Sequence, residues 1–308
     1  MSLRFRTLLA SAALALSAQV AMAQDTYTKT RYPIVLVHGM SGFDAIGPVD
    51  YFFNVPASLR ASGATVFTPM VSPFSTTEER GEQLRATLRQ LKAAYGYQKF
   101  NIIGHSHGGT TARYVAAVEP SLVASVTSMG TPHQGSKVAD VVKGVTGATG
   151  TTPLVASIVN ALGTAIAWMA GSPTLPQNAL GTLESLNTVG AADFNRRFPQ
   201  GSPTSTCGTG PEVVNGVRYY SAGGISVWTN LFDLSDGFLL AASVVFLGEA
   251  NDGVVSRCSS RWGTVLSDTY PWNHMDEVNQ AFGLRGWFTP DPVQFYRVQA
   301  NRLKNTGL

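Results

Sequence analysis

The pentapeptide GHSHG, residues 104–108, sets Ser106 between His105 and His107. A serine hydroxyl is a weak nucleophile until a base removes its proton, so this arrangement suggests nucleophilic acyl transfer. The G-x-S-x-G pattern alone is weak, because glycine and serine are common residues and an ordinary strand-to-helix turn can contain it. The flanking segments "FNII", typical of a strand, and "TTARYVAAV", typical of a helix, supply the strand-turn-helix context that a nucleophile elbow needs.

The base that activates the serine is not expected to be either neighbouring histidine. Side chains at adjacent positions of a sharp elbow diverge, so His105 and His107 should point away from the hydroxyl, with His105 packed beneath the elbow. The other histidines are His38, His133 and His274. In hydrolases that follow the order serine, acid, histidine, only His274 comes late enough in the chain to be the base.

The acid that orients the base must lie between the serine and His274, at the end of a strand. The candidate aspartates in this part of the chain include Asp140, Asp193, Asp233, Asp236, Asp252 and Asp268. The run AASVVFLGEANDGVVS, residues 241–256, predicts a β-rich segment followed by a turn that carries Asp252. We therefore expect Asp252 to accept the hydrogen bond of His274. Asp268 is the second choice, because it would need a tight local loop.

Acyl transfer also requires two backbone N–H groups that stabilise the oxyanion of the tetrahedral intermediate. One such group is expected at His107, directly after the nucleophile, and the other in the loop after an early strand. The run YPIVLVHGM, residues 32–40, predicts that strand and ends at Met40. Met40 is therefore the expected second donor, although the "HG" before it could be no more than a turn.

The elements that must position these groups follow from hydrophobic patterns. Thr76 and Glu79 have the spacing of a capping box, and Gly96 is a typical helix stop. Strands are predicted over 32–40, 64–71, 99–106 and 122–130, and helices over 75–96 and 107–120. This alternation predicts an α/β fold with a mostly parallel central sheet and helices on both of its faces.

Composition narrows the class of protein. Hydrophobic residues make up 44% of the 308 residues and charged residues 13%, against about 25% charged in a typical chain. This excludes a disordered chain and disfavours a nucleic-acid-binding protein with a basic face.

The first 23 residues have the pattern of an export signal, with Arg4 and Arg6 before an apolar run and Ala21 to Ala23 as the cleavage site. Their removal lowers the formal charge from +3 to +1. No other run reaches about 18 apolar residues, so we expect a soluble secreted product with one domain over 24–308.

A long uncharged window, residues 144–183, lies within the predicted domain. Apolar residues recur in it at helical spacing: Leu154, Val155, Ile158, Val159, Leu162, Ile166 and Met169. A core helix would explain the spacing. A mobile helical lid over the site is favoured by position, because the window follows the strand after the nucleophile.

Cys207 and Cys258 are the two cysteines of the chain. In an exported protein a single pair is most economically explained as one disulfide. A metal site is the weaker alternative, because no histidine lies within three or four residues of either cysteine.

With these residues placed, the chain resembles the secreted pseudomonad-type triacylglycerol lipases, which depend on a dedicated foldase. The resemblance runs through the whole mature sequence, in "YPIVLVHGM", "GFDAIGPVDYFF", "NIIGHSHGG", "ANDGVVS" and "NHMDEVNQAFGL". It implies an α/β-hydrolase fold with Ser106 as nucleophile, Asp252 as acid and His274 as base. It also implies Met40 and His107 as the oxyanion donors.

The resemblance further implies one structural calcium ion, held by the side chains of Asp233 and Asp276 and by the carbonyls of Gln280 and Leu284. Such an ion would stabilise the loop of the base without contacting substrate, and oxygen ligands suit a hard cation. The family also implies the Cys207–Cys258 disulfide, the lid, and a lipase-specific foldase during export. We expect a monomer. One departure, a stretch between Asp233 and Asp252 that is one residue shorter, affects no functional residue.

The expected activity is hydrolysis of long-chain acylglycerols at a lipid–water interface through a serine acyl-enzyme. A carboxylesterase acting on soluble short-chain esters is the nearer alternative, and the long uncharged window argues against it. A non-catalytic binding module on a hydrolase fold is the other alternative. Such modules typically lack one of the three catalytic groups, whereas this chain keeps all three in order.

Overall fold

The computed structural model describes residues 25–153, 160, 164, 166 and 170–308. Its centre is a sheet in the order β4-β1-β5-β6-β8, with β9 and β7 both paired to β8. The pairs are parallel except β7 with β8. The strands are β1 (Ile34–Val37), β4 (Val66–Phe67), β5 (Phe100–His105), β6 (Val123–Met129), β7 (Val213–Val214), β8 (Val217–Gly224) and β9 (Thr264–Tyr270). A separate hairpin joins β2 (Ala45–Ile46) and β3 (Val49–Asp50).

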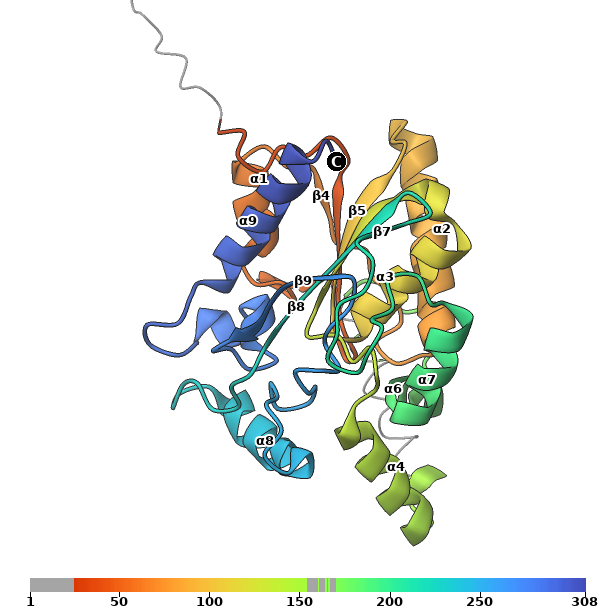
Figure 1. Ribbon diagram of the computed structural model, residues 1–308, viewed down its shortest axis with the longest axis vertical. Helices are drawn as coiled ribbons and strands as arrows, with labels where there is room; N and C mark the ends of the chain where they lie inside the picture. The colour runs from red at the N-terminus through yellow and green to blue at the C-terminus, as the bar shows by residue number, and fades with distance from the viewer. Residues whose placement is uncertain (1–24, 154–159, 161–163, 165, 167–169) are drawn as a thin grey trace, which may run out of the picture.

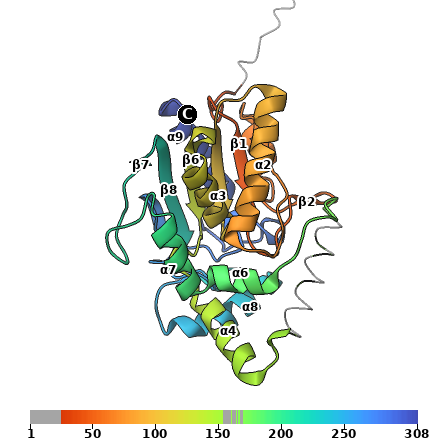
Figure 2. The same ribbon diagram turned by 90° about the vertical axis from the view of Figure 1, so that its right-hand side faces the viewer.

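Helices cover both faces of the sheet, as predicted (Figures 1 and 2). On one face lie α1 (Val55–Ala61) and α9 (Pro292–Asn305), and on the other α2 (Thr77–Tyr95) and α3 (His107–Val118). Each face has its own hydrophobic core of buried side chains. Two covered faces explain why every residue of β1, β5 and β6 is buried, and why β1, with the sequence IVLV, is apolar throughout.

A further group of elements surrounds the carboxyl ends of the parallel strands, the edge where ligand sites of α/β sheets lie. Figure 1 shows α4 and α8 projecting beyond that edge, at the bottom of the view. The helices are α4 (Lys137–Thr149), α6 (Ala179–Leu186), α7 (Thr188–Arg197) and α8 (Leu234–Ser243). The short 3₁₀ turns are η1 (Pro120–Leu122), η2 (Val244–Phe246), η3 (Asp276–Val278) and η4 (Ala281–Gly283).

Each element predicted up to residue 130 is present, although the strand predicted over 64–71 is reduced to β4, and the β2–β3 hairpin and α1 between the first two strands were not predicted. Helix α2 is the clearest case, because both of its predicted ends are observed. The Thr76 side chain accepts a hydrogen bond from the Glu79 N–H at 3.1 Å. Gly96, with φ 74°, ends the helix in the left-handed conformation that glycine adopts without strain.

The strand predicted before Asp252 is wrong. Residues 241–246 form the last turn of α8 and the turn η2 instead. Leu239 and Phe246 are buried while Val244 and Leu247 are exposed. Two buried residues seven positions apart fit a helical face, and the β-branched composition of the run misled the prediction.

Two predictions fall largely on residues outside the described ones. The signal segment 1–23 lies entirely outside them, and so does most of the centre of the 144–183 window, including Leu154, Leu162 and Met169. Of the window's apolar series, Ile166 is described, and it is buried. No helix of the described residues is long and apolar enough to cross a membrane.

Candidate active site

Ser106 lies at the sharp turn between β5 and α3, with φ 55° and ψ −129°. This backbone conformation is strained for a residue other than glycine, and such strain is typical of a nucleophile elbow. Glycines allow the turn, because a Cβ on Gly104 would collide with the backbone of Gly108, and one on Gly108 with the backbone of Val37. Gly39 packs directly on the serine, since a Cβ there would lie 2.8 Å from the Ser106 Cβ.

The side chains on either side of the serine diverge, as the elbow geometry predicts. The Nδ1 atom of His105 lies 2.8 Å from the Tyr51 hydroxyl, and the His105 ring packs against His274, with centroids 4.5 Å apart. The Nε2 atom of His107 lies 2.9 Å from the Thr77 hydroxyl, on α2. Both histidines are fully buried, and burial lowers the pKa of each well below its usual value.

Asp252 and His274, 22 positions apart in sequence, are brought together. The His274 Nδ1 lies 2.7 Å from Asp252 Oδ2, and the His274 N–H donates to the Asp252 carbonyl at 2.9 Å. The other carboxylate oxygen, Oδ1, accepts hydrogen bonds from the Val254 and Val255 N–H groups at 3.0 and 2.7 Å. The acid is thus held by its own loop while one oxygen orients the imidazole.

Ser106, His274 and Met40 all line one cavity of about 480 Å³. Its walls are mostly apolar and come from α4, α6 and α8, with Val142, Leu183 and Phe238 as examples. A cavity of this size lies in the range of roughly 300–1,000 Å³ that is usual for small-molecule sites.

The two expected oxyanion donors border the same turn. The Met40 residue is 44% exposed, and His107 is the first residue of α3, where helix N–H groups lack intrahelical acceptors. Neither N–H group has a backbone acceptor within the described residues.

A buried carboxylic acid beneath the Asp252–His274 pair was not anticipated from the sequence. Glu277 Oε1 accepts a hydrogen bond from the Gly224 N–H at 2.6 Å. Its Oε2 lies 3.2 Å from His105 Nε2 and 3.8 Å from His274 Nδ1. Burial, and next the Asp252 carboxylate, raise the pKa of Glu277 well above its usual range. This shift favours the protonated form of the Glu277 carboxyl, which lies against the His105 ring.

A second unanticipated residue is Arg80, which supports the loop that precedes Met40. Its guanidinium is fully buried and donates to the His38 carbonyl at 2.6 Å, to the Thr111 hydroxyl at 3.2 Å and to the Ser72 carbonyl. The salt bridges of the described residues do not include it. Burial lowers the pKa of Arg80 to about 9, so that it remains charged at neutral pH.

We call Tyr51, Arg80, His105 and Glu277 the buried floor of the site. The sequence carried a signal for two of them. Arg80 shares a helical face with Leu84 and Leu88, where a charged residue is out of place, and Glu277 follows His274 by three positions. Charged residues at apolar positions are rarely buried without a role.

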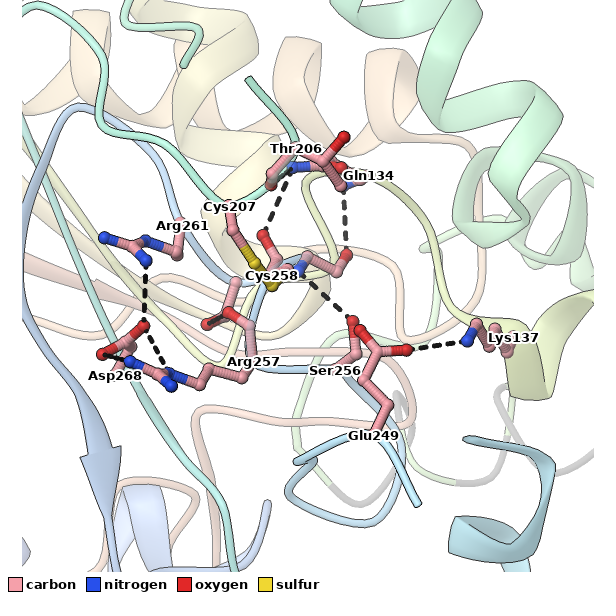
Figure 3. The surroundings of a disulfide bond; sticks show 12 residues. Gln134, Lys137, Thr206, Cys207, Glu249, Ser256, Arg257, Cys258, Arg261 and Asp268 are labelled. Atoms are coloured by element: carbon pink, nitrogen blue, oxygen red, sulfur yellow. Dashed lines mark hydrogen bonds and ion pairs between the residues drawn. A yellow bond between two sulfur atoms is a disulfide. The ribbon is translucent and has the colours of Figure 1, made fainter. Parts of the chain in front are cut away.

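The rejected candidates lie elsewhere and have their own partners. Asp268 pairs with Arg257 at 2.8 Å and with Arg261 at 3.5 Å (Figure 3). His38 bonds to the backbone of Gly39 and Val71. Asp140 accepts a hydrogen bond from the Thr188 N–H, and Asp193 pairs with Arg197. His133 bonds to the Arg113 guanidinium. Asp236 accepts hydrogen bonds from the Thr229 and Asn230 N–H groups and from Asn273.

The predicted disulfide joins Cys207 and Cys258, 51 positions apart in sequence. Figure 3 shows it beside Gln134, whose side-chain amide donates to the Cys258 carbonyl at 3.2 Å and to the Thr206 carbonyl at 2.6 Å. Cys258 follows Asp252 by six residues. The disulfide thus anchors the far end of the loop that carries the acid.

The residues expected to hold calcium include two buried carboxylates. Asp233 Oδ2 and Asp276 Oδ1 are buried and accept no hydrogen bond from the described residues. Burial, together with the charges of Asp236 and Asp233, raises the pKa of Asp276 to about 7. Gln280 and Leu284 are partly buried in the segment that follows Asp276. Two buried carboxylate oxygens without donors fit an oxygen-ligated divalent cation.

Within the described residues, a different group has the composition of a metal site, namely His105, His274 and Glu277. Each member already has one bonded atom, because His274 Nδ1 bonds to Asp252, His105 Nδ1 bonds to Tyr51, and Glu277 Oε1 accepts from the Gly224 N–H. A hard cation also prefers oxygen ligands over imidazole. We therefore interpret this group as part of the buried floor.

Comparison with known proteins agrees with this geometry. A family model described as the alpha/beta hydrolase fold matches residues 32–263. A triacylglycerol lipase of Vibrio cholerae is 48% identical over 289 residues, which cover 94% of this chain and 92% of that protein. A triacylglycerol lipase of Pseudomonas fragi is 42% identical over 295 residues, covering 92% and 100%. The crystal structure of a Staphylococcus hyicus lipase shares the fold, with a TM-score of 0.62 at 18% identity, covering 90% and 97%.

The fold and the matched residues define an enzyme of the alpha/beta hydrolase class that cleaves esters. Within that class, the chain belongs to the family of bacterial triacylglycerol lipases, at 42–48% identity over most of its length.

Proposed function

We propose that the protein hydrolyses the ester bonds of long-chain acylglycerols through an acyl-enzyme on Ser106. The observation that carries the proposal is the apolar cavity onto which Ser106, His274 and Met40 open, with Asp252 bonded behind His274. An apolar cavity suits an acyl chain, and the polar groups gathered at one wall suit its ester carbonyl.

In the proposed reaction Ser106 Oγ attacks the ester carbonyl carbon while His274 Nε2 takes the hydroxyl proton. Asp252 keeps the Nδ1–H tautomer in place and stabilises the imidazolium that forms. The tetrahedral intermediate collapses, and His274 donates the proton to the departing glycerol oxygen. Water then attacks the acyl-enzyme with His274 as base, and this step releases the fatty acid and restores the serine.

The N–H groups of Met40 and His107 are the proposed oxyanion donors. Loss of one such donor costs about 10²–10³ in kcat in well-studied hydrolases. Because Arg80 binds the His38 carbonyl, it acts as a positioning residue for Met40 rather than as a catalytic residue.

We propose that calcium binds between Asp233 and Asp276, with main-chain carbonyls of Gln280 and Leu284 as further ligands. The support is the pair of buried carboxylate oxygens without donors. The ion would neutralise clustered acids and cross-link α8 to the segment that follows His274. The ion would not contact the substrate, and the side chains and backbone of the chain would carry out the reaction.

Further parts of the proposal come from the sequence. We propose an export signal over 1–23, a secreted monomer, a lipase-specific foldase as export partner, and a lid within 144–183. The lack of charge in that window supports the lid. The Cys207–Cys258 disulfide supports an oxidising destination.

The test replaces Ser106 with alanine and measures hydrolysis of emulsified triolein and of soluble p-nitrophenyl acetate. Activity should fall by about 10⁴-fold or more, whereas Ser205→Ala, a change at an exposed loop serine, should leave it unchanged. An unaltered triolein rate in Ser106→Ala would refute the proposed nucleophile. A parent enzyme that prefers p-nitrophenyl acetate to triolein would favour a carboxylesterase.

A further inference from the structure

Large apolar side chains protrude to solvent in two segments, 231–247 and 282–288. Leu234 is 96% exposed and Phe288 fully exposed, and Leu231, Phe232, Leu247 and Trp287 are each more than 70% exposed. We call the exposed apolar residues of these two segments the apolar rim. Monomeric soluble proteins rarely expose so much contiguous apolar surface without a binding partner.

The two segments are joined by a hydrogen bond at their base, and the first of them borders the cavity through Phe238 and Leu239. The Asn230 side chain donates to the Arg285 carbonyl at 2.8 Å, which joins the loop before α8 to the second segment. Helix α8 itself contributes Ser235, Phe238 and Leu239 to the cavity wall. Figure 1 shows α8 projecting from the carboxyl end of the sheet. The apolar rim is thus continuous with the proposed acyl site.

The apolar rim carries almost no accessible charge. The charged residues of 231–247 are Asp233 and Asp236, and both are buried. In 282–288 the one charged residue is Arg285, whose guanidinium lies 3.9 Å from Asp291. Anionic partners such as nucleic acids and acidic headgroups are bound by clustered cations. This surface instead suits an electrically neutral, apolar partner.

Backbone conformation gives an independent reason to assign a role to the protruding residues. Leu247, Phe282 and Phe288 have positive φ angles of 51°, 60° and 67°. Such values are uncommon for bulky residues, and glycine would adopt them without strain. All three side chains are mostly exposed, so the hydrophobic core gains little from them. An external apolar phase would gain from each one.

We propose that the apolar rim is a permanent anchor for an uncharged lipid–water interface, with Trp287 and Phe288 at its tip. It deepens the proposed function, on which it rests, because it holds the cavity mouth against the surface of a neutral ester lipid. The anchor belongs to the side of the mouth formed by α8 and 282–288, outside the 144–183 window. Binding to the lipid surface is therefore separable from bond cleavage.

The test uses the full-length secreted enzyme and its Trp287→Ser/Phe288→Ser double variant. Partition is measured by flotation with triolein droplets, and chemistry with p-nitrophenyl acetate. The double variant should bind droplets at least about tenfold more weakly, given the apolar area withdrawn from oil, with kcat/KM on the soluble ester within about twofold of the parent. The matched control is Tyr95→Ser/Val213→Ser, two exposed apolar residues outside the apolar rim, which should behave as the parent.

Equal partition of the parent and the Trp287/Phe288 variant would overturn the proposal. So would binding that requires phosphatidylglycerol vesicles and is abolished by salt. Sedimentation supplies a third test. If the parent is a dimer and the double variant a monomer, while both bind droplets equally, the apolar rim is an interface between copies of the chain. A parent that floats with triolein yet cleaves neither ester would refute the proposed function and leave the anchor standing.

Discussion

The buried floor and the apolar rim lie at the same active site and are built in opposite ways. The floor side chains of Arg80, His105 and Glu277 are inaccessible to solvent and fixed by short hydrogen bonds. The apolar rim is exposed and has few polar contacts. The difference teaches that chemistry here depends on geometry, whereas surface binding depends on apolar area. Substitutions in the buried floor should therefore lower the rate of hydrolysis of every substrate. Substitutions in the apolar rim should lower the rate on aggregated lipid alone.

The largest effect is expected from Arg80→Met. It leaves the carbonyls of His38 and Ser72 without their donor, and each buried unsatisfied group costs about 1–3 kcal/mol. Stability should fall by about 3 kcal/mol or more, and kcat by about 10²-fold on soluble and emulsified esters alike. Urea unfolding and initial rates measure the two quantities. Arg80→Lys should recover part of both, and Arg89→Met, at an exposed position of α2, should change neither, because a single surface ion pair contributes little.

A loss of stability in Arg80→Met with unchanged kcat would contradict the positioning role. In that case the Arg80 guanidinium would serve folding alone. Arg80 would then no longer support the view that the buried floor controls the chemistry.

The next effect concerns the disulfide. Removing it by Cys207→Ser/Cys258→Ser should lower the free energy of unfolding by about 4 kcal/mol, because the unfolded chain regains the freedom of a 51-residue loop. Activity on the soluble ester at low temperature should persist, since Asp252 keeps its own backbone hydrogen bonds. Chemical denaturation of the variant and of the reduced parent should agree. A stable but inactive variant would mean that the bond positions the acid directly.

Asp276, between the buried floor and the apolar rim, predicts a pH effect. In calcium-free buffer the raised pKa of Asp276 keeps a proton on the folded protein, whereas the unfolded chain releases that proton above the ordinary aspartate pKa of 3.8. The protonated Asp276 therefore favours the folded state fully below pH 3.8. This contribution to the free energy of unfolding is lost as pH rises toward about 7. The loss is at most about 1.4 kcal/mol per pH unit.

The measurement compares urea unfolding of the parent and of Asp276→Asn between about pH 5 and pH 7. The parent should lose stability relative to the variant as pH rises, and excess calcium should abolish the loss in the parent alone. Parallel profiles with chelator would argue against the raised pKa. An unchanged unfolding midpoint on adding calcium would argue against the ion.

The smallest effect is expected from Leu247→Gly in the apolar rim. Relief of the left-handed conformation is worth about 1–2 kcal/mol and is largely offset by the flexibility of glycine, about 0.5–1 kcal/mol. Stability should rise slightly while triolein binding weakens a few-fold and soluble-ester kinetics stay constant. Tighter droplet binding would contradict the comparison, because it would mean that the protruding side chain hinders contact.

Features set by short-range signals were predictable from the sequence. The capping box at Thr76, the stop at Gly96 and the glycines around Ser106 act within a few residues, and the helix and the elbow followed from them. The order serine, aspartate, histidine then limited the choice of partners for Ser106. The run before Asp252 predicts a strand, but its residues 241–246 belong to α8 and η2, since Leu239 and Phe246 are buried on one face while Val244 is exposed.

Glu277 and Arg80 escaped prediction because their partners are remote in sequence. Glu277 bonds to Gly224, 53 positions earlier, and Arg80 bonds to His38, 42 positions earlier. A pattern within one segment does not report such contacts. The apolar rim escaped for a different reason, since sequence periodicity does not distinguish an apolar residue that faces the core from one that faces solvent.

The crowding of glycine backbones around Ser106 has a consequence for directed evolution. A Cβ at Gly104 or Gly108 collides with main chain that cannot move without displacing the elbow. Saturation libraries at these codons should therefore return glycine alone, whatever substrate is used for selection. Libraries are better directed at positions 287 and 288, where the side chains are exposed and many replacements should fold. Substitutions there should change which lipid droplets the enzyme binds.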